Sequence, residues 1–229
     1  MSTLEFYKDV LRPGRRDARI SGFTLIELLV VISIIAVLAS MLVGLAGTAS
    51  RKSKESRIRA ERDQYVTAIE SYKMSFSTYP PDNFDPLKNT VNPFSNQLFY
   101  ELTGTTFVKD RDSFVTLIGN YRINTSYVKQ IFNRDGFQNS NEETNQVKQF
   151  IHLRAGQFQV QTNANGQIPI PYLVVPVDWP PSRTDNPIGA GLTINPWRYV
   201  STSPTNNPNS FDLWADFVLG GKVKTIANW

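Results

Sequence analysis

The sequence predicts an α+β fold in which one long N-terminal helix packs against a small antiparallel β-sheet head. An apolar run from Gly22 to Val43 predicts the helix, and a helical apolar pattern continues it without proline or glycine from Ser50 to Phe76. The last third of the chain predicts the sheet, because short extended runs rich in aromatic residues alternate there with turn residues. A length of 229 residues suits one domain with an extension.

These patterns divide the chain into five segments. The first two lie at the membrane: a basic leader at residues 1–22 and a transmembrane half of the long helix at residues 23–49. The other three lie outside it: the extramembrane half of the helix at 50–78, a variable region of short helices and loops at 79–156, and a β-rich C-terminal head at 157–229.

The apolar run is long enough to cross a membrane. Between residues 23 and 49 its single charged residue is Glu27, and about 20 apolar helical residues span a hydrocarbon core of about 30 Å. One alternative is an ordinary signal anchor in which Glu27 is incidental. Another is a secretory signal peptide cut near Ala46 to Ala49, which is disfavoured because such signals have apolar regions of only about 7–15 residues.

Glu27 is the unusual residue of this run. A carboxylate at membrane depth costs about 2–3 kcal/mol even on lenient insertion scales, so it indicates a function and requires a partner. Cleavage after Gly22 would create a cationic partner, the new α-amine of Phe23, about one helical turn away. That amine can pair with Glu27 of the same subunit or of a neighbour.

The string GFTLIE at residues 22–27, preceded by a basic leader and followed by a long apolar helix, resembles the cleavage and methylation signature of type IV prepilins and type II secretion pseudopilins. The resemblance implies cleavage by prepilin peptidase between Gly22 and Phe23, N-methylation of Phe23, and a role for Glu27 in filament register. It also implies a pilin-like fold and a single-pass protein of the inner (cytoplasmic) membrane, with its C-terminal domain in the periplasm. The implied partners are other pseudopilins, an inner-membrane assembly platform and membrane lipid.

Beyond the membrane, the helix is expected to bury one face and to end before Tyr79, because the two prolines that follow disfavour helical geometry. The basic residues between Arg51 and Arg62 either contact anionic lipid headgroups or form a solvated face that is available for contacts between subunits. The expected buried stripe consists of Ile58, Arg62, Tyr65, Val66, Ala68, Ile69, Tyr72 and Phe76.

The central region, residues 79–156, is rich in Asn, Pro, Thr and Ser. It is longer than expected for the compact major pseudopilin, so we interpret it as an insertion or an enlarged variable region. Loops on a rigid scaffold tend to carry recognition, which places any partner-specific surface here. The short helices expected in it are Phe94 to Leu102, Ser126 to Phe132 and Glu142 to Leu153.

Strands are expected throughout the C-terminal third. The three tryptophans Trp197, Trp214 and Trp229 are expected to pack in a core rather than to form a ligand-binding box. Because of its prolines, the run from Ile168 to Val177 is at best an edge strand. The expected strands are Gln157 to Thr162, Ile168 to Val177, Asn195 to Val200, Ser210 to Trp214 and Ile226 to Trp229, with a turn at Asn163 to Gly166.

Landmarks after the long helix and in this third also resemble the type II secretion major pseudopilin. They are Tyr79-Pro80-Pro81, Asn195-Pro196-Trp197 with Tyr199, Phe211-Asp212-Leu213-Trp214 and the closing Asn228-Trp229. The resemblance implies a Ca²⁺ site between the last two landmarks.

Asp212 and Asp216 are the weak candidates for that Ca²⁺ site. The segment 217–227 lacks acids and contains Lys222 and Lys224, whereas Ca²⁺ requires six to eight oxygen ligands. We therefore expect the calcium site to be lost or altered, with hydrophobic contacts or a lysine pair in its place.

The remaining composition argues against an enzyme. The chain has no cysteine and a single histidine, His152. It also lacks a glycine-rich phosphate loop and a nucleophile elbow. Glu142 and Glu143 are adjacent, so on a helix they would point apart and would form no acid–base pair. The formal net charge of +4 is too small to indicate nucleic-acid binding.

These observations favour a structural subunit of a type II secretion pseudopilus. The alternatives are a type IV pilin for adhesion, motility or DNA uptake, and a membrane-anchored extracellular binding protein or enzyme that borrows the export signal. The secreted substrate and the choice between a major and a minor subunit stay open, although the enlarged centre leans toward a specialised or minor one.

Overall fold

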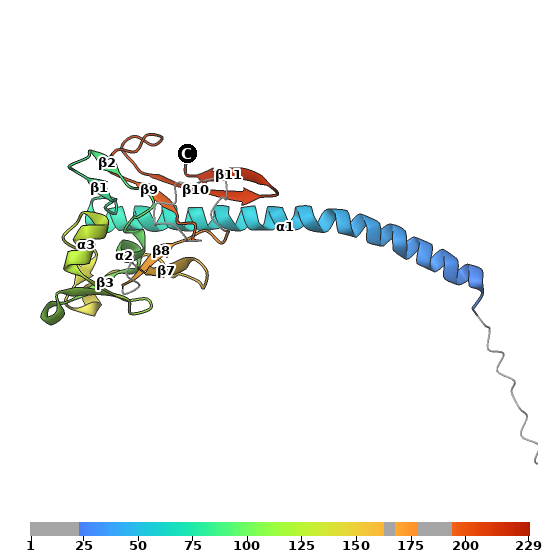
Figure 1. The fold of residues 1–229 in the computed structure, drawn as a ribbon, viewed down its shortest axis with the longest axis horizontal. Helices are drawn as coiled ribbons and strands as arrows, with labels where there is room; N and C mark the ends of the chain where they lie inside the picture. Colours follow the sequence, from blue (N-terminus) through green and yellow to red (C-terminus); the bar gives the residue numbers. More distant parts are fainter. Residues whose placement is uncertain (1–22, 163–167, 178–193) are drawn as a thin grey trace, which may run out of the picture. The chain divides into compact units, whose positions relative to one another are not determined.

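The computed structural model describes residues 23–162, 168–177 and 194–229, so the leader and the expected turn at 163–166 lie outside the described residues. Helix α1, Leu25–Phe76, is followed by short strands and helices (Figure 1). The chain divides into two compact units, and the boundary between Ala49 and Ser50 falls inside α1. The prediction that the helix ends before Tyr79 is confirmed, because the left-handed Ser77, with φ of 61°, follows its last residue.

All other elements belong to the second unit, Ser50–Trp229. The helices are α2 (Leu98–Thr103), α3 (Thr125–Phe132) and the 3-10 turns η1 (Lys109–Arg111) and η2 (Thr144–Gln146). The strands are β1 (Phe84–Asp85), β2 (Thr90–Val91), β3 (Thr105–Val108), β4 (Ser113–Thr116), β5 (Arg122–Asn124), β6 (Ser140–Asn141), β7 (Phe158–Thr162), β8 (Pro169–Leu173), β9 (Arg198–Val200), β10 (Asp212–Leu219) and β11 (Lys222–Ala227).

Four small sheets are formed by these strands. The C-terminal sheet has the order β11-β10-β9 and is antiparallel throughout. In the central region the order is β5-β4-β3-β6, and the β3–β6 pair is parallel. Two antiparallel pairs, β1–β2 and β7–β8, complete the set. The expected antiparallel head is thus present, and the predicted α+β class is confirmed.

The C-terminal half of α1 supplies one wall of the core. Most of its predicted stripe is buried, with Ile58, Tyr65, Ile69 and Tyr72 fully inaccessible to solvent. Arg62, Val66 and Phe76 are half-buried. The Tyr65 ring meets the Trp197 indole edge to face, with centroids 5.5 Å apart. Aromatic contacts of this kind contribute beyond simple area burial, so the stripe explains why the head folds onto this half of the helix.

The C-terminal hairpin is longer than the sequence patterns suggested. A tight turn at Gly220 and Gly221 joins β10 to β11, and both glycines have positive φ, +63° and +76°. Two positive φ values are what a type I′ hairpin turn requires, and a Gly-Gly pair meets that requirement without strain. The expected strand at Ile226 to Trp229 therefore begins already at Lys222.

The central region differs most from expectation. The helix expected at Ser126 to Phe132 is confirmed, whereas the helix expected at Glu142 to Leu153 is wrong. The Asn139 side chain holds that segment in a non-helical path, donating to the Lys148 carbonyl at 2.6 Å and accepting from the Lys148 N–H at 3.1 Å. The expectation of short helices and loops is also incomplete, because this region contains the four-stranded sheet β5-β4-β3-β6.

The three tryptophans have different environments. Trp197 is fully buried, as expected. Trp214 and Trp229 instead pair with each other, with ring centroids 5.7 Å apart, and half of Trp229 is exposed. The expected core role is therefore correct for Trp197 and wrong for Trp229.

Candidate functional site

The N-terminal end of α1 carries the residues singled out by the sequence. Gly22 lies outside the described residues, and Phe23 and Thr24 precede the helix, which begins at Leu25. Phe23 is 73 % exposed. Glu27 lies in the first turn of the helix, so the predicted processing and register residues are separated by one turn.

Glu27 forms a reciprocal cap with Thr24. One Glu27 carboxylate oxygen accepts the Thr24 backbone N–H at 2.8 Å and the Thr24 hydroxyl at 2.7 Å, and the Glu27 N–H donates to Thr24 Oγ1 at 3.3 Å. This is the geometry of a capping box, which satisfies N–H groups that a helix start otherwise leaves unpaired. The spacing of Thr24 and Glu27 was a usable signal for this cap, which the sequence reasoning missed.

The helix surface is apolar on all sides from Phe23 to Met41, the described part of the first unit's apolar run. Large hydrophobic side chains from Phe23 to Met41 are exposed around the whole circumference of the helix, among them Leu28, Ile32 and Ile35. In the part of α1 whose side chains the structure describes, no stretch combines the length and hydropathy that bilayer crossing requires. The expected span at residues 23–49 includes residues 42–46, whose side chains are outside that description.

The residues that follow Ala49 are basic and mostly exposed. Arg62, the polar member of the stripe, donates from Nη1 to the Ala227 carbonyl at 2.6 Å, so it ties the helix to the end of β11. Lys224 forms an ion pair with Glu55, which connects the same strand to the helix about two turns earlier. The lysine pair expected in place of a calcium site thus includes one residue, Lys224, that binds α1.

A buried carboxylate, Glu61, lines a cavity of about 580 Å³ beside α1. Its Oε1 pairs with Arg57 Nε at 3.1 Å, and its Oε2 is buried without a hydrogen-bond partner among the described residues. Burial raises the pKa of Glu61, and the Arg57 guanidinium opposes that shift. The sequence analysis did not single out Glu61. The structure identifies it because its side chain is buried next to the apolar stripe.

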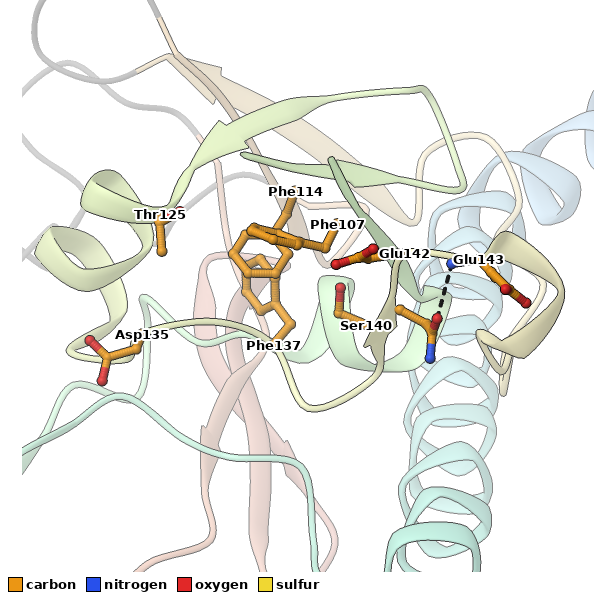
Figure 2. A pocket seen from close by; sticks show the side chains of 9 residues that line it. Phe107, Phe114, Thr125, Asp135, Phe137, Ser140, Glu142 and Glu143 are labelled. Carbon is orange, nitrogen blue, oxygen red and sulfur yellow. Dashed lines mark hydrogen bonds between the residues drawn. The ribbon is translucent and has the colours of Figure 1, made fainter. Parts of the chain in front are cut away.

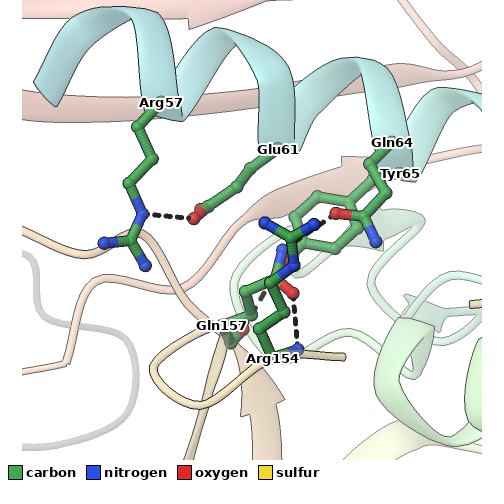
Figure 3. A network of polar contacts seen from close by, with 6 residues as sticks. All are labelled: Arg57, Glu61, Gln64, Tyr65, Arg154 and Gln157. Carbon is green, nitrogen blue, oxygen red and sulfur yellow. Dashed lines mark hydrogen bonds and ion pairs between the residues drawn. The ribbon is translucent and has the colours of Figure 1, made fainter. Parts of the chain in front are cut away.

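The same cavity is closed by a polar network from a distant segment. Figure 3 shows Arg154 and Gln157 facing the helix next to Gln64. Gln157 Nε2 donates to Gln64 Oε1 at 3.0 Å, and Gln157 Oε1 accepts the Arg154 backbone N–H at 2.7 Å. The network orders the chain just before β7 against α1.

A second buried carboxylate, Glu101 in α2, is fully enclosed. It accepts the backbone N–H groups of Gln138 and Asn139, both at 2.9 Å, and the Tyr72 hydroxyl at 2.9 Å. Burial raises the pKa of Glu101, and these hydrogen bonds act against the shift. Glu101 thereby fixes the loop before β6 to the end of α1, a structural role.

The weak metal candidates Asp212 and Asp216 serve as anchors for the chain. Asp212 accepts the backbone N–H groups of Thr205, Asn206 and Asn207 at 2.8–2.9 Å. Asp216 lies 3.7 Å from the Arg198 guanidinium and accepts the Thr225 hydroxyl.

These donors take up the carboxylate lone pairs that a Ca²⁺ ion would need, so the residues as arranged do not fit calcium. Within the described ranges, no three His, Cys, Asp or Glu side chains gather as a metal site.

The C-terminal landmarks meet at the end of the helix. Tyr199 Oη donates to the Pro80 carbonyl at 2.9 Å, and the Ser201 hydroxyl donates to the same atom at 3.0 Å. The Asn228 side chain accepts the Leu213 N–H at 2.9 Å and donates to the Phe211 carbonyl at 2.9 Å. Segments that are far apart in the sequence therefore hold one another in the head.

Comparison with known proteins gives one match. The family described as "Prokaryotic N-terminal methylation motif" matches residues 17–43. The chain thus carries a prepilin-type signal of the type IV pilin and pseudopilin superfamily, whose members are generally non-enzymatic structural proteins. The signal implies processing by prepilin peptidase, assembly with other pilins and anchoring in the inner membrane before assembly. Neither a curated protein nor a solved structure matches.

Proposed function

We propose that this prepilin-like chain is a structural subunit of a type II secretion pseudopilus. Cleavage after Gly22 yields a mature N-terminus at Phe23, and the subunit then passes from the membrane into a filament. The single observation that carries the proposal is the N-terminal half of α1, where exposed apolar side chains surround the one capped carboxylate, Glu27.

The apolar surface supplies the attraction between subunits, and Glu27 supplies the register. Apolar helices can slide along one another at little cost, because one apolar neighbour is much like the next. A charged group cannot slide in this way, because a subunit in the wrong register leaves a buried charge unpaired. In the correct register, the Phe23 amine of a neighbouring subunit lies within reach of Glu27.

The choice of a secretion pseudopilus over a type IV pilus is supported by the C-terminal landmarks. Their segments resemble those of the major pseudopilin, and in this structure they pack together around Pro80 and Phe211. A type IV pilin would instead produce visible surface filaments and retraction phenotypes, which electron microscopy and motility assays would detect.

The first test is the intact mass and the N-terminal residue of the protein purified from membranes, with and without a prepilin peptidase. We expect N-methylated Phe23 when the peptidase is present and Met1 when it is absent. A chain that keeps Met1 in both cases, or that begins near Ala49, would overturn the assembly role of Glu27 and favour a membrane-anchored binding protein.

The second test separates secretion from other filament functions. Deletion of the gene should abolish export of the secreted substrates while leaving motility and surface adhesion unchanged. Loss of motility with normal export would assign the chain to a type IV pilus.

A further inference from the structure

We propose that a groove in the central region, with an acidic rim and a phenylalanine floor, binds a basic patch at the start of the second unit of another copy. The result is a head-to-tail contact between copies. This inference rests on the proposed filament function and adds a second contact to it, outside the apolar helices.

The groove is a cavity of about 620 Å³ whose floor is aromatic (Figure 2). Phe107 and Phe114 from β3 and β4 have ring centroids 5.0 Å apart, and Phe137 meets Phe114 edge to face at 5.1 Å. Phe137 also stacks on the buried Tyr100 ring at 4.3 Å. The floor is therefore anchored to the core and holds its shape before any ligand binds.

The rim of the groove is acidic. Glu142, Glu143 and Asp135 line it, and no lysine or arginine does. Asp135 is paired with Lys129 at 2.8 Å, whereas neither Glu142 nor Glu143 has an ion-pair partner in the part of the chain that the structure describes. Glu143 accepts one hydrogen bond, from Gln146. Two carboxylates beside an aromatic floor suit a cationic side chain, which gains both ion pairing and a cation–π contact.

One polar group inside the groove also lacks a partner. Ser140 Oγ is buried and makes no hydrogen bond within the described residues. In Figure 2 its hydroxyl lies between the phenylalanine floor and the acidic rim. This hydroxyl is shielded from solvent, so it adds a polar position to the floor of the groove.

The same unit carries a matching basic patch, which we define as Arg51, Lys52, Lys54 and Lys222. All four residues are exposed. The Arg51 guanidinium lies against the Gly220 turn, since a Cβ placed on Gly220 would be 2.8 Å from Arg51 Nη1. Lys52 and Lys54 have no carboxylate within ion-pair distance among the described residues. The patch is therefore a cationic surface whose lysines at positions 52 and 54 form no ion pair among the described residues.

The groove and the basic patch lie at opposite ends of the second unit. In Figure 1, β3 and α3 lie near the C-terminal end of α1, and the turn between β10 and β11 points toward the start of the unit. A contact between two different surfaces on identical subunits is heterologous, and repeating it builds an open filament unless the rotation closes a ring. Charge complementarity within one chain therefore identifies a second copy as the occupant.

The test uses the full-length chain, in membranes where the filament machinery is present. Because the chain has no cysteine, two single-cysteine variants can be co-expressed with different tags. They are Asn141→Cys in the groove and Ser53→Cys within the basic patch. Mild oxidation should give a crosslinked heterodimer. The matched control replaces Asn141→Cys with Ser203→Cys, an exposed serine outside the groove, and should give at least tenfold less crosslink.

Charge reversal then tests the chemistry. Glu142→Lys with Glu143→Lys on the groove copy should lower the crosslink about tenfold, because like charges face each other across the contact. Lys52→Glu with Lys54→Glu on the other copy should do the same, and combining both reversals should restore it. Restoration excludes misfolding as the cause of the loss.

The outcomes separate this inference from the proposed function. Filaments that form without the crosslink, or a crosslink that no charge reversal alters, would overturn the inference and leave the proposed function intact. Charge reversal of the basic patch could instead release the chain from vesicles of anionic lipid without changing the crosslink. That result would assign the patch to lipid binding and also overturn the inference. An unprocessed N-terminus without filaments would overturn the proposed function and the inference with it.

Discussion

The two halves of helix α1 differ in how their apolar residues are arranged. From Phe23 to Met41, apolar side chains cover the whole circumference, and all of the described ones are exposed. From Ser50 to Phe76, most apolar residues form one buried or half-buried stripe, and most charged residues lie outside it. A helix that buries one face needs one apolar stripe, whereas a helix surrounded by lipid or by other helices needs apolar residues on every side.

This difference assigns the two halves to different tasks. The C-terminal half stabilises the head, so its substitutions should change the free energy of unfolding. The described apolar side chains of the N-terminal half are exposed, so its substitutions should change membrane insertion and assembly instead.

The largest effect is expected in the core. Trp197→Ala removes a fully buried indole that packs on Tyr65, and it should lower the free energy of unfolding by about 3–5 kcal/mol. Chemical denaturation of the detergent-solubilised chain, followed by tyrosine and tryptophan fluorescence, measures this change. The control Leu29→Ala, in the other half of the helix, should leave the unfolding midpoint of the head unchanged. An equal shift in both variants would refute the division.

The next effect concerns assembly alone. Glu27→Ala should leave head stability unchanged and reduce filament formation at least tenfold. Without the carboxylate, a misregistered subunit no longer pays the cost of about 2–3 kcal/mol for an unpaired charge at membrane depth, so the correct register loses its advantage. Filaments are counted by electron microscopy of sheared cells that express equal amounts of the protein. If Glu27→Ala assembles as well as the parent, the register role is wrong.

A smaller effect separates capping from register. Thr24→Ala removes the hydroxyl that caps the helix while keeping the charge of Glu27, and it should cost the helix start about 1 kcal/mol. Amide hydrogen exchange of the first turn in micelles should rise accordingly. Thr24→Ser keeps the hydroxyl and should behave like the parent, and protection that is unchanged in both variants would argue against the cap.

The smallest effect is a pH dependence of the head. Because burial raises the pKa of Glu61 above its ordinary value near 4.5, the folded state favours the protonated form. Stability is then greatest below about pH 4.5 and falls as the pH rises through the folded pKa. Glu61→Gln should flatten this part of the stability curve, measured by thermal unfolding between pH 4 and pH 8. A decline that persists in Glu61→Gln would assign it to another group, such as Glu101.

The sequence predicted the features that depend on local patterns. The end of α1, its stripe and the existence of strands within Gln157 to Thr162 and Ile168 to Val177 all follow from periodicity and turn residues. The Gly220–Gly221 turn and the Thr24–Glu27 cap also had local signals, which went unused.

The features that escaped prediction depend on distant partners. Strand β6 has two residues and pairs in parallel with β3, more than thirty positions earlier. The Asn139 contacts that exclude a helix after it are likewise a tertiary effect. Glu61 and Glu101 interact with residues far along the chain, Arg154 and Asn139 respectively. Hydrophobic patterns carry no information about such polar contacts.

The Thr24–Glu27 cap has a consequence for how subunits enter and leave a filament. The carboxylate already has two donors before any neighbour arrives. Pairing with the Phe23 amine of another subunit therefore adds a cation to a carboxylate that is already hydrogen-bonded. The cap keeps the carboxylate of a lone subunit hydrogen-bonded, and the amine compensates its charge only in the correct register. A subunit can thus wait in the bilayer as a stable reserve and return to it when the filament shortens.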